Sequence, residues 1–332
     1  MLVLGIETSC DETAAAVVRD GKKILSDVVY SQLVHQKYGG VVPELASREH
    51  IKTLIPVVQE ALKKARVSLD RIQGIAVTYG PGLVGSLLIG LSFAKALSYS
   101  LGIPFVGINH LEGHIFAIFL EHPRLKPPFI CLIVSGGHSE LFLVRGKGDY
   151  LNLGKTRDDA AGEAFDKVAK LLDIGYPGGP AIDKISQKGD PLFFRFPRAF
   201  LKGSLDFSFS GLKTAVALYV LKKRSEKSSF PTADISASFQ EAVVDVLVEK
   251  SIRAAVSEGV GKIACVGGVA RNFRLREKFK KKAREENLKI YFPSPILCTD
   301  NAAMISACGD FRLSRGERAG LDLNAVPYAE LV

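Results

Sequence analysis

The chain lacks several features that mark common protein classes. None of its 332 residues is tryptophan, and its five cysteines never occur as Cys-x-x-Cys, which excludes a zinc ribbon and favours reduced thiols. No uninterrupted run of about 18 apolar residues occurs, so we expect no transmembrane helix. The first residues also lack the basic start of a signal peptide and read as a strand. The sequence therefore predicts a protein without structural disulfides and without a membrane span.

Acidic residues are outnumbered in this chain. It has 35 aspartates and glutamates against 44 lysines and arginines, giving a net charge of +9. The densest basic stretches are residues 222–224 and residues 271–284, which include Lys280, Lys281 and Lys282. This pattern indicates a polyanionic partner such as nucleic acid, although a solvated, lysine-rich helix face would have the same composition.

The order of apolar and polar segments predicts a duplicated α/β fold. In the first half, we expect strands at residues 2–6, 14–18, 23–29, 74–78 and 104–108, with helices at residues 51–65 and 86–100. In the second half, we expect strands at residues 130–134, 141–144, 150–154, 262–266 and 290–293, with a basic helix and then a closing helix at residues 302–313. Both halves open with an apolar strand, a small polar loop, an apolar strand, a turn and a third strand.

Two lobes follow from this duplication. We expect residues 1–125 to form an N-terminal lobe, completed by a C-terminal helix over residues 302–332. Residues 126–301 would form a C-terminal lobe with a mostly helical insertion at residues 156–232. If the lobes face each other, their first hairpin loops lie on opposite walls of one cleft.

A pair of histidines follows the apolar strand at residues 104–108. His110 and His114 are four residues apart, so on a helix they project from the same face and can hold one divalent metal ion. The spacing alone is often coincidental, but a strand-to-helix junction is where α/β proteins place ligands. Glu112 points about 200° around the helix from His110, so the segment is not the His-Glu-x-x-His signature of a zinc peptidase.

Two glycine-bearing loops and one aspartate are further candidates for ligand binding. The segments Ser135–Gly137 and residues 267–268 follow buried strands, an arrangement that lets backbone N–H groups bind phosphate. Asp300 is the best third metal ligand, because it ends an apolar segment and opens a helix, although it could equally be a helix N-cap. Two histidines and one carboxylate with open positions suit zinc or non-haem iron. Together these loops resemble the nucleotide cleft of the actin–hexokinase superfamily.

Six motifs in order extend the resemblance to almost the whole chain. They are residues 5–13 (GIETSCDET), 39–48 (GGVVPELASR), 80–85 (GPGLVG), 110–114 (HLEGH), 134–138 (VSGGH) and 298–301 (CTDN). In these motifs the chain resembles the tRNA N6-adenosine threonylcarbamoyltransferase family, formerly described as O-sialoglycoprotein endopeptidases. Residues 206–213 (DFSFSGLK) resemble the bacterial branch in particular.

This resemblance implies a cytoplasmic enzyme of the actin–hexokinase fold. It would transfer the threonylcarbamoyl group from threonylcarbamoyl-adenylate to N6 of the adenosine 3′ of the anticodon, in tRNAs reading codons that begin with A. His110, His114 and Asp300 correspond to the ligands of an iron or zinc ion. The substrate-binding positions correspond to Ile133, Val134, Ser135, Gly136, Gly137, Asp166, Gly179, Asp183 and Asn272. The implied partners are tRNA, an inactive paralogue that forms a heterodimer with the chain, and a small ATPase.

The general base and the reaction class leave alternatives open. Asp11 is our hypothesis for the base, because it lies in the first hairpin loop, and Glu12 and His138 are its rivals. Asp11 could equally stabilise the turn. An ATP-dependent kinase or ATPase of the same fold is the alternative function, and steady ATP hydrolysis without tRNA would favour it.

Overall fold

The chain divides into two compact units. The computed structural model describes residues 1–226 and 231–331. Unit 1 comprises Met1–Leu125 together with the chain from Pro293 onward, and unit 2 comprises Lys126–Phe292. Residues 227–230 of the predicted insertion and Val332 of the predicted C-terminal helix lie outside the described residues.

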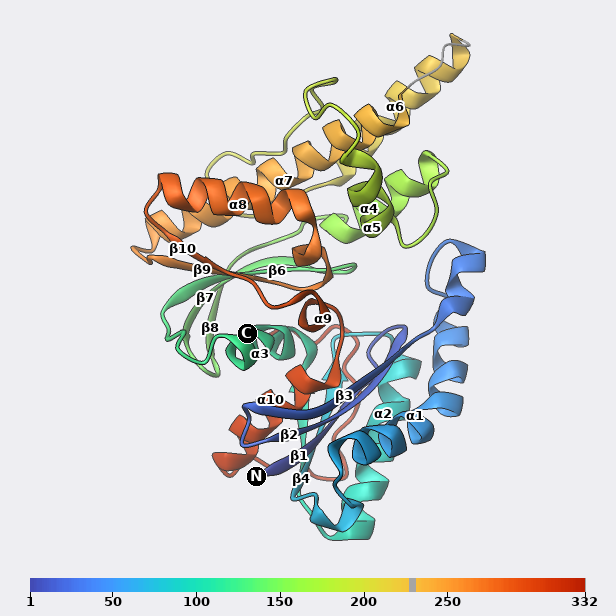
Figure 1. Ribbon diagram of the computed structural model, residues 1–332, viewed down its shortest axis with the longest axis vertical. Helices are drawn as coiled ribbons and strands as arrows, with labels where there is room; N and C mark the ends of the chain where they lie inside the picture. Colours follow the sequence, from blue (N-terminus) through green and yellow to red (C-terminus); the bar gives the residue numbers. More distant parts are fainter. Residues whose placement is uncertain (227–230, 332) are drawn as a thin grey trace. The chain divides into compact units, whose positions relative to one another are not determined.

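A five-stranded mixed sheet forms the centre of unit 1 (Figure 1). Its order is β3-β2-β1-β4-β5, with β1 antiparallel to β2 and parallel to β4, which is parallel to β5. Consecutive residues of β1 and β2 are fully buried, so this sheet is covered on both faces. The strands are β1 (Leu2–Glu7), β2 (Glu12–Arg19), β3 (Lys23–Ser31), β4 (Gly74–Gly80) and β5 (Phe105–Asn109).

Helices cover the two faces of this sheet. On one face, α1 (Pro43–Ala65) and α2 (Val84–Leu101) pack with Leu4 and Ile6 of β1. On the other face, α10 (Ala302–Ser314) packs against β2 and β1, and α3 (His110–Glu121) packs against α10. A Cβ on Gly5 would lie only 2.4 Å from the carbonyl oxygen of Ala302, so this glycine allows α10 its close approach to the sheet. The short elements of unit 1 are η1 (Leu33–Tyr38), η2 (Leu69–Arg71) and α9 (Pro295–Cys298).

One helix of unit 1 has the length and apolar composition of a membrane span. This helix is α2, and a third of its residues are buried in the unit. Leu87, Leu91 and Ala94 line its buried face, and Leu91 and Ala94 belong to the main apolar cluster of unit 1. One face of α2 therefore packs into the core of unit 1.

Unit 2 repeats the topology of unit 1 and adds helices. Its sheet order, β10-β9-β6-β7-β8, is the same arrangement of a three-stranded antiparallel meander followed by two parallel strands, which confirms the predicted duplication. The strands are β6 (Phe129–Val134), β7 (Ser139–Gly146), β8 (Asp149–Lys155), β9 (Lys262–Val266) and β10 (Lys289–Tyr291). The helices are α4 (Ala161–Leu171), α5 (Gly178–Ser186), α6 (Ser210–Ser225), α7 (Thr232–Ser257), η3 (Gly268–Arg271) and α8 (Phe273–Glu285).

Four segments differ from the sequence predictions. Helix α1 begins at Pro43 instead of residue 51, because proline suits the first turn of a helix. The helix predicted at residues 302–313 is α10, which ends at Ser314, but the described chain beyond it is not part of a C-terminal helix. It runs along unit 1, with Ala319 N–H bonded to Phe105 O and Val326 N–H to Tyr79 O. The insertion is less helical than predicted, since residues 187–209 form no helix. Residues 293–301 belong to unit 1, where Leu297 packs against β2.

A buried ion pair joins α3 to α10 and gives a test of this packing. The Glu112 side chain is fully buried, and its Oε2 lies 2.7 Å from Nη2 of Arg312. Replacing one partner of such a pair leaves an uncompensated charge in the interior. We expect Arg312→Met to lower the free energy of unfolding by about 3–5 kcal/mol in chemical denaturation.

An exposed pair serves as the control for this experiment. Lys63 is largely exposed and its Nζ lies 3.9 Å from Glu60, so Lys63→Met should cost less than about 1 kcal/mol. Equal losses for the two variants would show that the α3–α10 pair has no special role in the stability of unit 1.

Candidate functional site

Three neighbouring parallel strands of unit 1 bring polar residues to one edge of the sheet. Glu7 ends β1, Thr78 lies near the end of β4, and Asn109 ends β5. Because β1, β4 and β5 are parallel neighbours, their carboxyl ends meet, and ligand sites of α/β proteins lie at such edges. Thr78 Oγ1 donates a hydrogen bond of 2.7 Å to Oε2 of Glu7. Sequence reasoning missed Glu7, whose only local signal was a carboxylate directly after an apolar strand.

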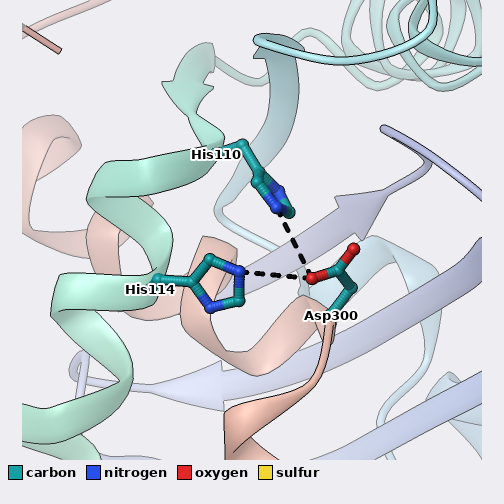
Figure 2. A group of neighbouring side chains, drawn as sticks. All are labelled: His110, His114 and Asp300. Atoms are coloured by element: carbon teal, nitrogen blue, oxygen red, sulfur yellow. Dashed lines mark ion pairs between the residues drawn. The ribbon is translucent and has the colours of Figure 1, made fainter. Parts of the chain in front are cut away.

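Helix α3 starts at this edge and carries both histidines. Asn109 caps the helix, since its side-chain oxygen accepts a hydrogen bond of 2.9 Å from Leu111 N–H. The rings of His110 and His114 lie with centroids 4.7 Å apart in an edge-to-face arrangement. Both rings are buried and point toward the same carboxylate oxygen of Asp300 (Figure 2). The predicted histidine pair is therefore on one helix face, as expected.

Asp300 reaches the histidines from the segment between α9 and α10. Its Oδ1 lies 3.5 Å from Nε2 of His110 and 3.2 Å from Nε2 of His114. The N-cap of α10 is the next residue, Asn301, whose side chain accepts a hydrogen bond from Met304 N–H. The alternative role of Asp300 as the helix cap is therefore excluded, and its carboxylate is available to the histidines. One ligand atom from each of the three residues lies within 4.8 Å of the others.

Within this cluster, the charge of each histidine and carboxylate shifts the pKa of its neighbours. Burial disfavours charge here, but the Asp300 and Glu7 carboxylates raise the pKa of His110 well above its usual value. Burial likewise opposes charge on Asp300, yet His110 and His114 hold the pKa of Asp300 well below its usual range. A proton on His110 thus balances the carboxylates, the role that a bound cation would otherwise have.

Glu112 does not contribute to the cluster. Its carboxylate is bound by Arg312, whose Nε lies 2.8 Å from the same Glu112 oxygen that Nη2 approaches. This contact explains physically why the helix presents His110 and His114 on one side and a structural carboxylate on another.

In unit 2, the turn at Ser135–Gly137 packs on the start of α4. Gly162 N–H donates to Ser135 O at 3.2 Å, and Glu163 N–H donates to Gly136 O at 3.1 Å. A Cβ on Gly162 would lie 2.5 Å from Ser135 O, so only glycine fits there. The backbone of Ile133 and Val134 leads from β6 into this turn, and space remains open beside Gly136 and Gly137.

Helix α5 links the other predicted substrate-binding residues. Asp166 of α4 accepts a hydrogen bond of 2.7 Å from Gly178 N–H, next to Gly179. One turn further along α5, Asp183 accepts from Phe273 N–H at 3.1 Å, next to Asn272. Burial raises the pKa of Asp183, and backbone N–H groups offset this only in part. The four predicted residues Asp166, Gly179, Asp183 and Asn272, distant in sequence, therefore meet around one helix.

Asn272 also has a structural role. Its Oδ1 accepts a hydrogen bond from Leu275 N–H at 2.9 Å, which caps α8, and its Nδ2 donates to Oε1 of Gln240 at 2.6 Å. A ligand contact by this side chain must therefore use the remaining lone pair of Oδ1 or replace the bond to Gln240.

The three candidates for the general base lie at hairpin turns. Asp11 lies between β1 and β2 of unit 1, Glu12 is the first residue of β2, and His138 lies between β6 and β7 of unit 2. Burial, followed by the nearby charges of Asp300 and Asp11, raises the pKa of Glu12 well above its usual value. The backbone of His138 closes its turn by two bonds with Ser135.

Comparison with known proteins decides the family. The family model of tRNA N6-adenosine threonylcarbamoyltransferase matches residues 23–307. The chain belongs to this family. It is 58% identical to the tRNA N6-adenosine threonylcarbamoyltransferase of Syntrophus aciditrophicus, over 98% of this chain and 96% of that protein. It is 54% identical to that of Caldicellulosiruptor saccharolyticus, over 100% of this chain and 99% of that protein. The family resemblance noted from the six motifs is confirmed.

Solved structures confirm the fold class of this family member. HypF from T. kodakarensis is 16% identical, with a TM-score of 0.63, and the match covers 95% of this chain and 48% of that one. The ROK hexokinase of Thermus thermophilus is 17% identical, with a TM-score of 0.50, over 95% of this chain and 100% of that one. At these identities the likeness shows the α/β fold of the actin–hexokinase type and nothing about activity.

The residues of the unit 1 cluster fit a divalent metal ion. Among the described residues neither ring nitrogen of His114 makes a hydrogen bond of good geometry, although both are buried; Nε2 has only the approach of Asp300 Oδ1 at 3.2 Å. A buried polar atom without a partner costs about 1–3 kcal/mol, which coordination of an ion would remove. Two imidazole nitrogens and one carboxylate oxygen form a donor set suited to zinc or to non-haem iron.

Removing any one ligand should empty this site. We expect His110→Ala, His114→Ala and Asp300→Ala each to give folded protein with little bound metal, because the two remaining ligands compete poorly with water. Metal content by mass spectrometry and far-UV circular dichroism measure the two properties. Glu112→Gln is the matched control on the same helix and should keep its metal, since Glu112 binds Arg312. Full occupancy in Asp300→Ala, or an empty site in Glu112→Gln, contradicts the ligand assignment.

Gly179 gives a test of the substrate site that does not disturb the fold. No atom lies within 4 Å of where its Cβ would be, so Gly179→Val should leave the free protein intact. If the nucleotide lies against this glycine, the added side chain should reduce adenylate affinity by at least about tenfold, a loss of about 1.4 kcal/mol. Isothermal titration with a non-hydrolysable adenylate analogue measures the change.

Gly211 is the matched control for Gly179. It also occupies the second position of a helix, α6, and a Cβ there would also meet open space. Gly211→Val should therefore bind the analogue as the parent protein does. Equal affinity in the parent chain, Gly179→Val and Gly211→Val would show that the nucleotide does not bind at the start of α5.

Proposed function

We propose that this chain transfers the threonylcarbamoyl group from threonylcarbamoyl-adenylate to N6 of the adenosine 3′ of the anticodon, in tRNAs reading codons that begin with A. The family match over residues 23–307 carries this proposal. The intact cluster of His110, His114 and Asp300 supports it, because the ligand set suits an iron or zinc ion. The hexokinase likeness shows only the fold, so it gives no support to the alternative of an ATP-dependent kinase.

The reaction is an acyl transfer to a weakly nucleophilic amine. A bond forms between N6 and the carbamoyl carbon, the bond from that carbon to the phosphate oxygen breaks, AMP leaves, and N6 loses a proton to a base. A metal bound by His110, His114 and Asp300 would supply Lewis-acid polarisation of the carbonyl group. The protein must therefore mainly orient the donor and acceptor, which is how enzymes accelerate such steps without a protein nucleophile.

Unit 2 would hold the nucleotide half of the donor. The open space beside Gly136, Gly137 and Gly179 allows a ligand to approach the backbone closely. Asp166 and Asp183 are fixed by backbone N–H groups and so offer oriented carboxylate oxygens near this space. Asn272 begins α8, where helix N–H groups favour an anion. These contacts support a nucleotide site built from Ile133–Gly137, Asp166, Gly179, Asp183 and Asn272.

The base that accepts the N6 proton is proposed to be Asp11, with Glu12 and His138 as rivals. Glu12 gains support from burial and from the charges of Asp300 and Asp11, which raise its pKa and so make its carboxylate a stronger base than that of an ordinary glutamate. Asp11 and Glu12 share the hairpin that follows Glu7, close enough to Asp300 for its charge to act on Glu12.

The cellular setting follows from the proposed reaction. A tRNA-modifying enzyme works in the cytoplasm, and its adenylate is made by a separate enzyme. We include the inactive paralogue and the small ATPase as partners. Exposed apolar side chains on two neighbouring helices support a protein partner: Ile51 and Ile55 on α1 and Val84 on α2 are more than half exposed, and the two helices pack side by side in unit 1 (Figure 1).

Reconstitution tests the function directly. The chain, threonylcarbamoyl-adenylate and unmodified tRNA are mixed with and without the two partners, and the digested nucleosides are analysed by mass spectrometry. We expect threonylcarbamoyl-adenosine only when adenylate and tRNA are both present. Steady hydrolysis of ATP by the chain without tRNA, and no modified adenosine with all partners present, would favour the kinase alternative instead.

The basic helix α8 should contribute to tRNA binding. Lys280 and Lys281 are exposed, and Lys282 forms an ion pair of 3.0 Å with Glu285. If these lysines contact phosphates, tRNA affinity should fall steeply with salt, because bound counterions are released. Reversing all three to glutamate should weaken binding and lower the salt slope by about 0.7–0.9 for each phosphate that the protein no longer neutralises. Filter binding at several salt concentrations measures both quantities.

A charge reversal of Lys63 and Lys64 on α1 is the control for the α8 variant. It removes exposed positive charge from unit 1 without touching α8. Equal losses of affinity in the two variants would show that the loss comes from the change in net charge and not from contacts of α8 with tRNA. An unchanged affinity in the α8 variant would place the tRNA surface elsewhere.

A further inference from the structure

The buried carboxylate of Glu7 is held by three donors around the candidate metal cluster. Its Oε1 accepts a hydrogen bond of 2.5 Å from Ser9 N–H, and its Oε2 accepts one of 2.7 Å from the Thr78 hydroxyl. The same Oε2 lies 3.0 Å from Nδ1 of His110. The Glu7 side chain is fully buried, so its position is fixed by these contacts and not by solvent.

These contacts determine which nitrogen of His110 carries the proton. An ionised carboxylate can only accept hydrogen bonds, so Nδ1 of His110 must donate to Glu7. If Nδ1 lacked its proton, its lone pair would face a buried carboxylate oxygen at 3.0 Å. Ser9 Oγ, 3.2 Å from the same nitrogen, can act as donor or acceptor and imposes no choice. Nε2, on the other side of the ring, faces Asp300 (Figure 2), so a metal ion that binds His110 must bind through Nε2, in place of a proton there.

We propose that Glu7 is a positioning residue for the metal: by accepting a hydrogen bond from Nδ1–H of His110, it fixes the ring and presents Nε2 as the ligand. The inference rests on the proposed metal role of the cluster. Carboxylate partners of this kind orient metal-binding histidines and increase their basicity. His114 has no corresponding partner among the described residues, so the fixed ligand of the pair is His110.

The topology of the sheet explains how this contact arises. Glu7 and His110 are 103 residues apart in sequence. They meet because β1 and β5 flank β4 and all three run parallel, so the end of β1 and the start of α3 lie at one edge. Thr78 of the intervening strand β4 completes the contact by its hydroxyl bond to Glu7.

Zinc binding to the full chain tests the inference with Glu7→Gln. A glutamine has one oxygen and one NH₂ group, whereas both oxygens of Glu7 accept hydrogen bonds. In one orientation the NH₂ group of the glutamine faces the Ser9 N–H donor, and in the other it faces the donors of Thr78 and His110. We expect the zinc Kd, measured by competition with a chelator, to rise about 10- to 100-fold. Thr78→Val is the matched control: it removes one donor to Glu7 but leaves His110 its partner, and it should change the Kd by much less.

A spectroscopic readout separates orientation from mere stability. In zinc-loaded protein with ¹⁵N-labelled histidine, we expect His110 to show a protonated Nδ1 and a metal-bound Nε2. This measurement uses the unaltered chain, so it holds even if Glu7→Gln fails to fold. Coordination of His110 through Nδ1, or a folded Glu7→Gln protein with unchanged zinc affinity, would overturn the inference. Failure of the unaltered chain to bind zinc or ferrous iron would instead overturn the proposed metal role itself.

Discussion

The candidate site of unit 1 depends on the meeting of three parallel strand ends at one edge of a sheet. Strands β1, β4 and β5 deliver Glu7, Thr78 and the start of α3 to that edge. The placement gathers two carboxylates and two imidazoles in a region that is almost fully buried. Buried charges of one sign are costly unless a cation balances them. We propose that a divalent ion is this cation, because the cluster offers two imidazole nitrogens and one carboxylate oxygen to it.

The two units use the same topology for different chemistry. In unit 1, the loop after β1 is acidic and lies beside a donor set for a metal. In unit 2, the equivalent loop after β6 is Ser135–Gly137, which carries no charge and leaves its backbone open. Helices α4 and α5, which belong to the insertion of unit 2, supply Asp166, Gly179 and Asp183 beside that backbone. Under the proposed function, duplication of the fold gives one unit that holds a cation and another that holds an anionic nucleotide.

The sequence predicted the features that depend on local pattern. Alternation of apolar strands with small polar loops gave both meanders and the duplication, and His110 and His114 were placed on one face by helical spacing alone. The features it missed depend on contacts between distant residues. Whether Asp300 or Asn301 caps α10 is decided by the attraction of Asp300 to the histidines. Glu7 was missed because its partner His110 begins α3, 103 residues away in sequence. The helix predicted at residues 302–313 is confirmed, but the chain after Ser314, which was also assigned to a C-terminal helix, bonds to β5 and β4 instead.

X-ray absorption spectroscopy of the metal-loaded chain tests the central claim most directly, since the claim is that this sheet edge forms a metal site of two imidazole nitrogens and one carboxylate oxygen. For zinc, we predict nitrogen and oxygen ligands at about 2.0–2.2 Å, with the outer-shell signal of two imidazoles. That imidazole signal should weaken in His114→Ala. A sulfur ligand at about 2.3 Å, or a signal without imidazole, would contradict the account.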